Sequence, residues 1–379
     1  MKIRSITATE VIVPANPGAI NSSGLSRPLH RLPVAGRVGW SVQFDELPKC
    51  ILRMQLEDGT VGLGECYRGH DWATIEAVST VLLNRRFEEI ALQSLPIGAC
   101  REYDGFECAI WDCFARVHGL RVVDLLGGAL RTEVKIGAWS GHRESREVGS
   151  LCEEFARKGY DCVKFKCDLQ DDVVGWCREI ADRAPGLKVI LDPNERWKTP
   201  AETRERIDAL REIGNILCLE DPIPRWMLDE YRRLRQFSPI PIVLHVSLPY
   251  LQEGQRVSDA VLALKQSAVD GFNFNAGLAK FQCLDHVAVA AGLPCWHGSE
   301  VDLGILEAMY LHSCAAAQSC VWPSDIFGRL IRSHDLLKKP LEISPPYASL
   351  PEGPGLGVEL DEESLKRYQI QERWFKLGQ

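Results

Sequence analysis

The chain has 379 residues, of which 45% are hydrophobic, and a formal net charge of −8. This length and composition suffice for a large core and exclude an intrinsically disordered chain. The negative charge, without a local basic cluster, argues against a nucleic-acid partner. Apolar runs all fall short of the roughly 20 residues of a membrane span, and the N-terminus does not resemble a signal peptide. We therefore expect a soluble cytoplasmic protein with no membrane partner.

The first 125 or so residues mix predicted strands and helices. Residues 3–13 alternate like a strand, and the long segment from Pro14 to Gly39 is rich in Pro, Gly, Ser and Arg, which is typical of a lid or a disordered loop. Asp58-Gly59 predicts the turn of a hairpin. Apolar spacing then predicts two helices, over residues 71–92 and 105–118. Together these elements predict an α+β cap.

From Val134 onward the sequence repeats a pattern of strand, polar turn and helix. Eight strand starts at the spacing of one βα unit fit a closed barrel. After Val321 the repeat stops, and we expect the tail to pack on the first domain. The predicted strands begin near Val134, Cys162, Val189, Ile216, Pro241, Val269, Leu293 and Cys320.

Fourteen cysteines are scattered along the chain without a CxxC pair or a His/Cys cluster at zinc spacing. Several lie inside apolar runs, where a free cysteine fills core space. A disulfide framework belongs to small secreted chains, so we interpret these cysteines as buried apolar side chains.

Polar residues follow three apolar, β-branched runs, as expected where buried parallel strands reach the C-terminal mouth of a barrel. Lys164 and Lys166 are separated by one residue and therefore point to the same side of a strand. Asp192 and Glu220 end the next two strands, and hard oxygen ligands arranged in this way suit Mg²⁺, with Asn194 as a further ligand or an orienting group. A buried lysine near a second cation has a lowered pKa and is a candidate general base.

Later strand ends add further candidates. Asn273 and Asn275 alternate with phenylalanines, and His297 ends the seventh predicted strand. A histidine at that place is either catalytic or a hydrogen-bonded structural residue. Glu300 and Asp302 follow in the same loop and either bind substrate hydroxyl groups or cap the next helix.

At this point the chain resembles the enolase superfamily, in its mandelate racemase and muconate lactonizing branch. The resemblance rests on ECAIWDCFARVHGLRVVDLLGG, KFK, LDPNERW, LEDP and GPGLGVEL, and it covers nearly the whole chain. It implies a modified TIM barrel, (β/α)7β, under an α+β cap, with Mg²⁺ stabilising an enolate, and a homo-oligomer. The implied domains are a cap over residues 1–128, the barrel over 129–325, and a segment over 326–379 that returns to the cap.

Carried over by this resemblance, Lys166 is the base that abstracts the proton and Lys164 is its partner on the side of the substrate carboxylate. Asp192 and Glu220 are two of three metal ligands. The fifth strand departs from the family, because His245 or Val246 stands where the third acid belongs, and Glu253 lies farther along the chain and would have to fold back. With His245 as the third ligand, the site favours another divalent ion or no metal.

The sixth strand also departs, because Asn275 occupies the place of a catalytic Lys or Asp. His297 lies near the seventh-strand histidine of the family but lacks its acid partner. The acid that the lactonizing branch carries on the eighth unit is matched best by Asp302.

We therefore expect abstraction of the proton α to a carboxylate, with dehydration of a sugar acid as the leading hypothesis and His297 assisting the departing hydroxyl group. The alternatives are a racemase, epimerase or cycloisomerase that forms the same enolate, and a non-catalytic barrel that binds a carboxylate or a partner. Arg27 and His30 in the long N-terminal loop are candidates for binding an anionic substrate, or are solvated.

Overall fold

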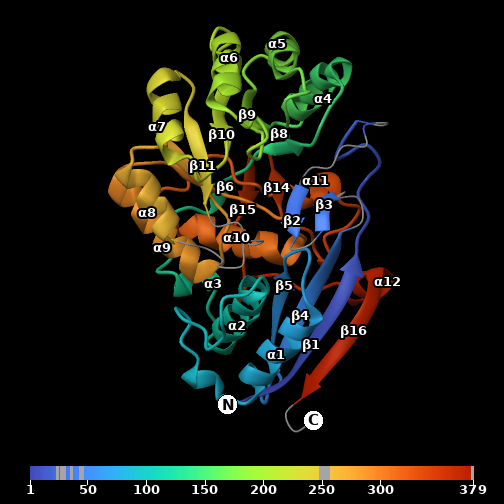
Figure 1. Cartoon of the computed structure of the whole chain (residues 1–379). Helices are drawn as coiled ribbons and strands as arrows, with labels where there is room; N and C mark the ends of the chain where they lie inside the picture. Colours follow the sequence, from blue (N-terminus) through green and yellow to red (C-terminus); the bar gives the residue numbers. More distant parts are fainter. Residues whose placement is uncertain (23–24, 26–30, 35–36, 42–46, 247–256, 377–379) are drawn as a thin grey trace.

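The computed structural model describes residues 1–22, 25, 31–34, 37–41, 47–246 and 257–376. Figure 1 shows an antiparallel sheet at one end of the molecule and a ring of helices around parallel strands at the other. In the described ranges, no helix is long and apolar enough to cross a membrane. All 14 cysteines are free, and all except Cys100 and Cys283 are buried, which confirms the interpretation that they fill core space.

The cap contains a four-stranded antiparallel sheet whose strands come from both ends of the chain. Its order is β16-β1-β4-β5, and β4 and β5 form the predicted hairpin. Two helices pack on this sheet, and the second comes so close to β5 that a Cβ built on Gly64 would lie 2.1 Å from the carbonyl oxygen of Gly105. The strands are β1 (Ile3–Ile12), β4 (Pro48–Leu56), β5 (Val61–Cys66) and β16 (Gln369–Lys376), and the helices are α1 (Trp72–Leu83) and α2 (Tyr103–Val117).

The long N-terminal segment that was predicted to be a loop contains regular structure. Strands β2 (Arg31–Val34) and β3 (Arg37–Ser41) pair antiparallel and form a separate two-stranded sheet. The prediction of a loop is therefore wrong for Arg31–Val34 and Arg37–Ser41, because their backbones pair as two strands. Arg27 and His30 lie outside the described residues.

The second sheet is parallel and has seven strands in the order β13-β12-β11-β10-β9-β8-β7. The predicted eighth strand is reduced to isolated bridges, which join Cys320 to Cys295 and Ser324 to Ile136 and so link the two edges of the curled sheet. Its strands are β7 (Ala138–Ser140), β8 (Cys162–Lys166), β9 (Lys188–Asp192), β10 (Ile216–Glu220), β11 (Ile242–Val246), β12 (Gly271–Phe274) and β13 (Cys295–His297).

The first barrel strand starts later than predicted. The segment at Val134 forms β6 (Glu133–Lys135), which pairs with β15 (Tyr347–Ser349) of the C-terminal segment instead of joining the barrel. Strand β15 also pairs with β14 (Ile343–Ser344). The barrel therefore begins at β7, four residues after the predicted start.

Helices alternate with the strands and surround the parallel sheet (Figure 1). They are α4 (Ser145–Arg157), α5 (Val173–Arg183), α6 (Pro200–Leu210), α7 (Leu228–Phe237), α8 (Val257–Lys265), α9 (Leu278–Ala291) and α10 (Gly304–Ala316). Shorter elements complete the chain: η1 (Phe87–Glu89), α3 (Val122–Leu125), α11 (Gly328–Ile331) and α12 (Glu362–Tyr368).

Candidate active site

The barrel interior is built in layers, because alternate residues of a strand point to the same side. Apolar side chains from five strands form one buried layer, and the residue two positions further along four of these strands is polar. Those four polar residues are Lys164, Asp192, Glu220 and His245, and the apolar layer consists of Cys162, Ile190, Cys218, Val243 and Trp296. The strands thus bring the polar residues together at their C-terminal ends, as the sequence predicted.

Lys164 is the centre of an ion-pair cluster. Its Nζ lies 2.7 Å from Glu220 Oε2, 2.9 Å from Asp325 Oδ2 and 3.2 Å from Asp192 Oδ2. Lys166 pairs with the same Oδ2 of Asp192, and its Nζ donates a hydrogen bond of 2.8 Å to Asn194 Oδ1. Two lysines and three carboxylates therefore share one buried site.

The two lysines differ in their electrostatic surroundings. Burial opposes the charge on Lys164, but Asp325, Glu220 and Asp192 outweigh burial and raise the pKa of Lys164 well above its usual value. Burial lowers the pKa of Lys166, and the neighbouring Lys164 ammonium lowers it further against the opposing effect of Asp192. At neutral pH Lys164 is thus the fixed cation, and Lys166 is the better candidate for a general base.

The carboxylates respond to the same charges. Burial would raise the pKa of Asp192, but the two lysines outweigh burial and lower it. Burial, together with the adjacent Asp192, raises the pKa of Glu220 to about 8. The site therefore contains one firmly ionised carboxylate and one whose charge depends on a nearby cation.

Residues suited to hold a metal lie beside this cluster. His245 Nδ1 is 3.5 Å from Glu220 Oε1, and Asn273 Nδ2 donates a hydrogen bond of 2.7 Å to the same oxygen. Neither ring nitrogen of His245 makes a hydrogen bond within the described part of the chain. Two carboxylates and a buried imidazole with unpartnered nitrogens are a donor set that fits a divalent cation. The Asn273 side chain, which was a candidate for binding substrate, thus contacts Glu220 and holds that carboxylate in place.

Asp221 is close to the same donors but is engaged elsewhere. Ligand atoms of Asp221, Glu220 and His245 lie within 4.8 Å of one another. The Oδ1 of Asp221 accepts the backbone N–H of His245 at 2.9 Å, and its Oδ2 accepts Arg225 Nε at 2.7 Å. Asp221 thus fixes the end of β11, which carries His245.

Asp325 is a site residue that the sequence interpretation missed. It follows the bridged segment that takes the place of the eighth strand, and its carboxylate reaches Lys164. Asp302, which was matched to the acid of the eighth unit, lies in the loop after β13, as expected, but its carboxylate pairs with Lys49 of the cap. The signal was available, because Asp325 lies at the end of the strand predicted to begin near Cys320.

His297 lies on the other side of the barrel wall from the site. Its neighbour Trp296 occupies the inward position, so the imidazole of His297 points outward. The ring stacks between Phe281 and Tyr310, at centroid distances of 4.6 and 3.9 Å. Its nitrogens contact the carbonyl oxygens of Gly298 and Ala276 at 2.7 and 3.1 Å. A catalytic His297 would have to face the barrel mouth, but the inward position of β13 belongs to the preceding residue. The geometry therefore favours the structural alternative for His297.

Asn275 is bound to the cap. The hydroxyl oxygen of Tyr67, just after β5, lies 2.9 Å from Asp104 Oδ2 and 3.2 Å from Asn275 Oδ1, so its single hydrogen is shared between these two acceptors. The residue at the sixth-strand position of the family's catalytic group is therefore buried and tied to the cap.

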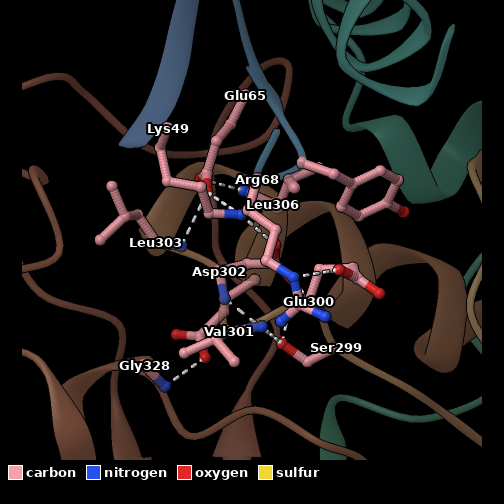
Figure 2. A network of polar contacts seen from close by, with 12 residues as sticks. Lys49, Glu65, Arg68, Ser299, Glu300, Val301, Asp302, Leu303, Leu306 and Gly328 are labelled. Carbon is pink, nitrogen blue, oxygen red and sulfur yellow. Dashed lines mark hydrogen bonds and ion pairs between the residues drawn. The ribbon is translucent and has the colours of Figure 1, made fainter. Parts of the chain in front are cut away.

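Glu300 and Asp302 belong to a buried network between cap and barrel, shown in Figure 2. Lys49 of β4 pairs with Asp302 and lies 3.3 Å from Glu65 Oε1. Glu65 in turn accepts the backbone N–H groups of Leu303 at 2.8 Å and Leu306 at 3.2 Å, and so caps the start of α10.

The same network holds the loop after β13. Asp302 Oδ2 accepts hydrogen bonds from the hydroxyl groups of Ser299, at 2.8 Å, and Tyr310, at 2.7 Å. Glu300 Oε2 lies 3.0 Å from Arg68 Nε, as Figure 2 shows. It also lies 3.6 Å from Arg101 Nη2. Both acids are therefore held by protein groups, which favours a structural role for Asp302.

A small cavity of about 20 Å³ lies between this loop and the lysines. Val301, which lines it, has φ of 61°, an outlier for a β-branched residue, and such strain is usual at functional sites. The lining residues are Arg68, Trp139, Lys164, Lys166, His245, Ser299, Glu300, Val301, Asp325 and Phe327. Glu253, like His30, lies outside the described residues.

Comparison with known proteins is consistent with this geometry. Residues 147–364, more than half of the chain, match the family described as "Enolase C-terminal domain-like". Muconate cycloisomerase 1 of Rhodococcus opacus is 28% identical over 337 residues, which cover 82% of this chain and 86% of that protein. The o-succinylbenzoate synthase of Geobacillus stearothermophilus is 24% identical over 301 residues, covering 76% of this chain and 73% of that protein.

Solved structures share the whole fold. N-succinyl Arg/Lys racemase from Bacillus cereus superposes with a TM-score of 0.82 at 19% identity, covering 99% of this chain and all of that one. The 2-chloromuconate cycloisomerase from Rhodococcus opacus superposes with a TM-score of 0.80 at 23% identity, covering 98% of this chain and 100% of that one. These likenesses confirm the predicted fold class, a modified barrel with an α+β cap.

Proposed function

The chain belongs to the enolase superfamily, in its mandelate racemase and muconate lactonizing branch, and from this premise we propose that it forms an enolate by removing the proton α to a carboxylate of a small acid. One observation carries the proposal: Lys164 and Lys166 lie together with Asp192 and Glu220 at the C-terminal ends of β8, β9 and β10. Active sites of barrels lie at this face.

Lys166 is the proposed base. Its lowered pKa increases the fraction of neutral amine at neutral pH, and its contacts with Asp192 and Asn194 fix the direction of the amine. Lys164 remains charged because three carboxylates surround it, so it is the proposed partner of the enolate oxygen. A divalent cation held by Asp192, Glu220 and His245, with Mg²⁺ as the ion expected from the family, would polarise the substrate carboxylate.

The finer proposal is dehydration of a sugar acid or a related hydroxy acid. The two residues at the family's catalytic positions on the sixth and seventh strands are engaged elsewhere, since Asn275 is tied to Tyr67 and His297 points out of the barrel. This favours a reaction in which one base works on one face of the substrate. The Lys166 amine takes the α-proton and the C–H electron pair forms the enolate. The enolate then expels the β-hydroxyl group, which leaves as water with the proton returned by Lys166.

A cycloisomerase is the second candidate, and it is supported by the names of the curated relatives, several of which are muconate or chloromuconate cycloisomerases. A single acid–base group suffices for such a reaction as well. Racemisation ranks lower because it requires acid–base groups on both faces of the enolate. A barrel that binds a carboxylate without turnover remains the non-catalytic alternative.

Proton exchange in D₂O tests the proposal. The protein is incubated with a library of sugar acids, other hydroxy acids and unsaturated dicarboxylates, and deuterium at the α-carbon is measured by NMR. Loss of water from a substrate identifies dehydration, and formation of a lactone identifies a cycloisomerase. Lys166→Met is expected to slow exchange by about 10²- to 10⁴-fold. Lys188→Met, at the exposed start of the adjacent strand β9, is the matched control. Absence of exchange for every acid in the library contradicts the proposal.

A further inference from the structure

We infer that Asp192, Glu220 and His245 form a centre that selects a transition-metal dication, such as Co²⁺ or Zn²⁺, over Mg²⁺. This inference rests on the proposed function insofar as it names the ion of the same site. It goes beyond that function because the ion is chosen by one residue of this chain, the imidazole of His245 on β11, in place of a third carboxylate.

The position of His245 is fixed by the barrel. Val243 belongs to the apolar layer inside the barrel, and His245 lies two residues later on the same side of β11. Its backbone N–H is held by Asp221 at 2.9 Å, which locks the end of the strand. The ring therefore faces Glu220, with Nδ1 3.5 Å from Oε1.

The imidazole is buried without a hydrogen-bond partner. Only 6% of the side chain is exposed, and in the ranges that the structure covers neither ring nitrogen is hydrogen-bonded. Buried polar atoms in folded proteins are nearly always paired, so two orphaned nitrogens beside a carboxylate indicate a missing ligand. A dication bound to the nitrogen lone pair that faces Glu220 would satisfy one of them.

The chemistry of the donors decides which ion fits. Mg²⁺ prefers oxygen ligands in octahedral geometry and retains water, whereas imidazole suits Zn²⁺, Fe²⁺, Ni²⁺ and Cu²⁺. The carboxylates here are already shared with ammonium groups, since Asp192 pairs with Lys164 and Lys166, and Glu220 pairs with Lys164. A hard ion that depends on carboxylate charge must compete with both lysines, while an ion that also bonds the imidazole depends less on that charge.

A second group of metal-type side chains provides a control. His142, Asp168 and Asp171 also have ligand atoms within 4.8 Å of one another, but they lie in the loops after β7 and β8. Metal bound there would mimic the expected signal. His142→Asn therefore accompanies every His245 variant in the experiment.

Metal binding is measured directly on the full chain after removal of metals with a chelator. Titration calorimetry gives the affinities for Co²⁺ and Mg²⁺, and the visible absorption of bound Co²⁺ reports whether nitrogen enters its coordination shell. We expect Co²⁺ to bind to the wild-type protein at least tenfold more tightly than Mg²⁺, following the general order of affinities. The same preference is expected in His142→Asn.

Two variants of His245 separate the ligand from its surroundings. Loss of a residue that only hydrogen-bonds to a metal ligand weakens metal binding roughly 10- to 100-fold. His245→Ala removes a ligand itself and is expected to weaken Co²⁺ binding by more than that. His245→Asp restores a third carboxylate and is expected to shift the preference toward Mg²⁺ and to change the Co²⁺ spectrum. Circular dichroism checks that each variant is folded. If His245→Ala does not fold, the wild-type preference and His245→Asp still decide the question.

The inference is overturned if wild-type protein binds Mg²⁺ as tightly as Co²⁺, or if His245→Asp leaves the preference unchanged. Loss of the Co²⁺ signal in His142→Asn alone would also overturn it, because the ion would then occupy the other group. Its failure is distinct from failure of the proposed function. Proton exchange without selective Co²⁺ binding refutes only the ion, and selective Co²⁺ binding without exchange of any acid refutes only the reaction.

Discussion

Replacement of Lys49 by methionine tests how the cap is held on the barrel. The Lys49 ammonium lies between two carboxylates, Glu65 at 3.3 Å and Asp302, and the lysine is 3% exposed while both acids are fully buried. Methionine retains most of the apolar stem of the lysine but removes its charge. The variant therefore keeps the packing and leaves two buried carboxylates without their cation.

The expected loss in the free energy of unfolding follows from the burial of the pair and from its distance. At 3.3 Å, an effective dielectric constant of about 20 gives a gross attraction of about 5 kcal/mol for the Lys49–Glu65 pair. Removal of one partner of a buried pair lowers the free energy of unfolding by about 3–5 kcal/mol, because the remaining charge stays desolvated. We expect a loss in this range for Lys49→Met.

The loss is expected to grow with pH. Burial raises the pKa of Glu65 even though Lys49 opposes the shift, and removal of Lys49 leaves only the backbone hydrogen bonds of Leu303 and Leu306 to oppose the rise. A carboxyl group with a raised pKa in the folded state holds a proton that the unfolded chain releases, so stability falls as pH rises above the ordinary glutamate value. Near that value the variant is therefore closest to the wild type.

Urea-induced unfolding, followed by the fluorescence of the buried tryptophans, measures the loss at several pH values. Lys338→Met is the matched control, because its partner Glu359 is 3.0 Å away but both side chains are 70% exposed. Such surface pairs contribute little to stability. If Lys49→Met is as stable as Lys338→Met, or if the difference shrinks as pH rises, the ion-pair reasoning is refuted.

Two further predictions concern the cap. Burial and Asp104 raise the pKa of Glu107 from 4.5 to about 8, so the stability of the wild-type protein should fall as pH rises through this interval. Glu107→Gln removes this titration and should flatten the pH dependence of the unfolding midpoint. Gly64→Ala should lower the free energy of unfolding by about 1–3 kcal/mol, because its Cβ would lie 2.1 Å from the Gly105 carbonyl oxygen, as measured by denaturant unfolding. Gly98→Ala, with no atom within 4 Å of the added Cβ, should be harmless, and equal losses in the two variants would exclude this explanation.

The positions of two lysines and two carboxylates of the site could be predicted from the sequence because strand geometry is periodic. Lys164 and Lys166 are two residues apart, so they lie on the same side of β8, whatever surrounds them. Asp192 and Glu220 end the two strands that follow, and parallel strands deliver their C-terminal residues to one face. The structure places all four in contact, in agreement with the prediction of their neighbourhood.

The sequence interpretation misplaced His297 and missed Asp325, for different reasons. A shift of one residue reverses the face of a side chain, and sequence gives the end of a strand less accurately than that. His297 therefore fell on the outer side, between Phe281 and Tyr310. Asp325 ends a segment with only isolated bridges, so its direction toward Lys164 depends on closure of the barrel.

The sequence by itself determined the family resemblance, the barrel repeat, the hairpin of the cap and the departure of His245 from an acid. These follow from local periodicity and residue identity. Only the tertiary structure decided that Asp302 and Asn275 serve the contact with the cap, because their partners Lys49 and Tyr67 lie 253 and 208 residues away in the chain. The choice of partner for a buried polar group depends on which surfaces dock, and that information is not local.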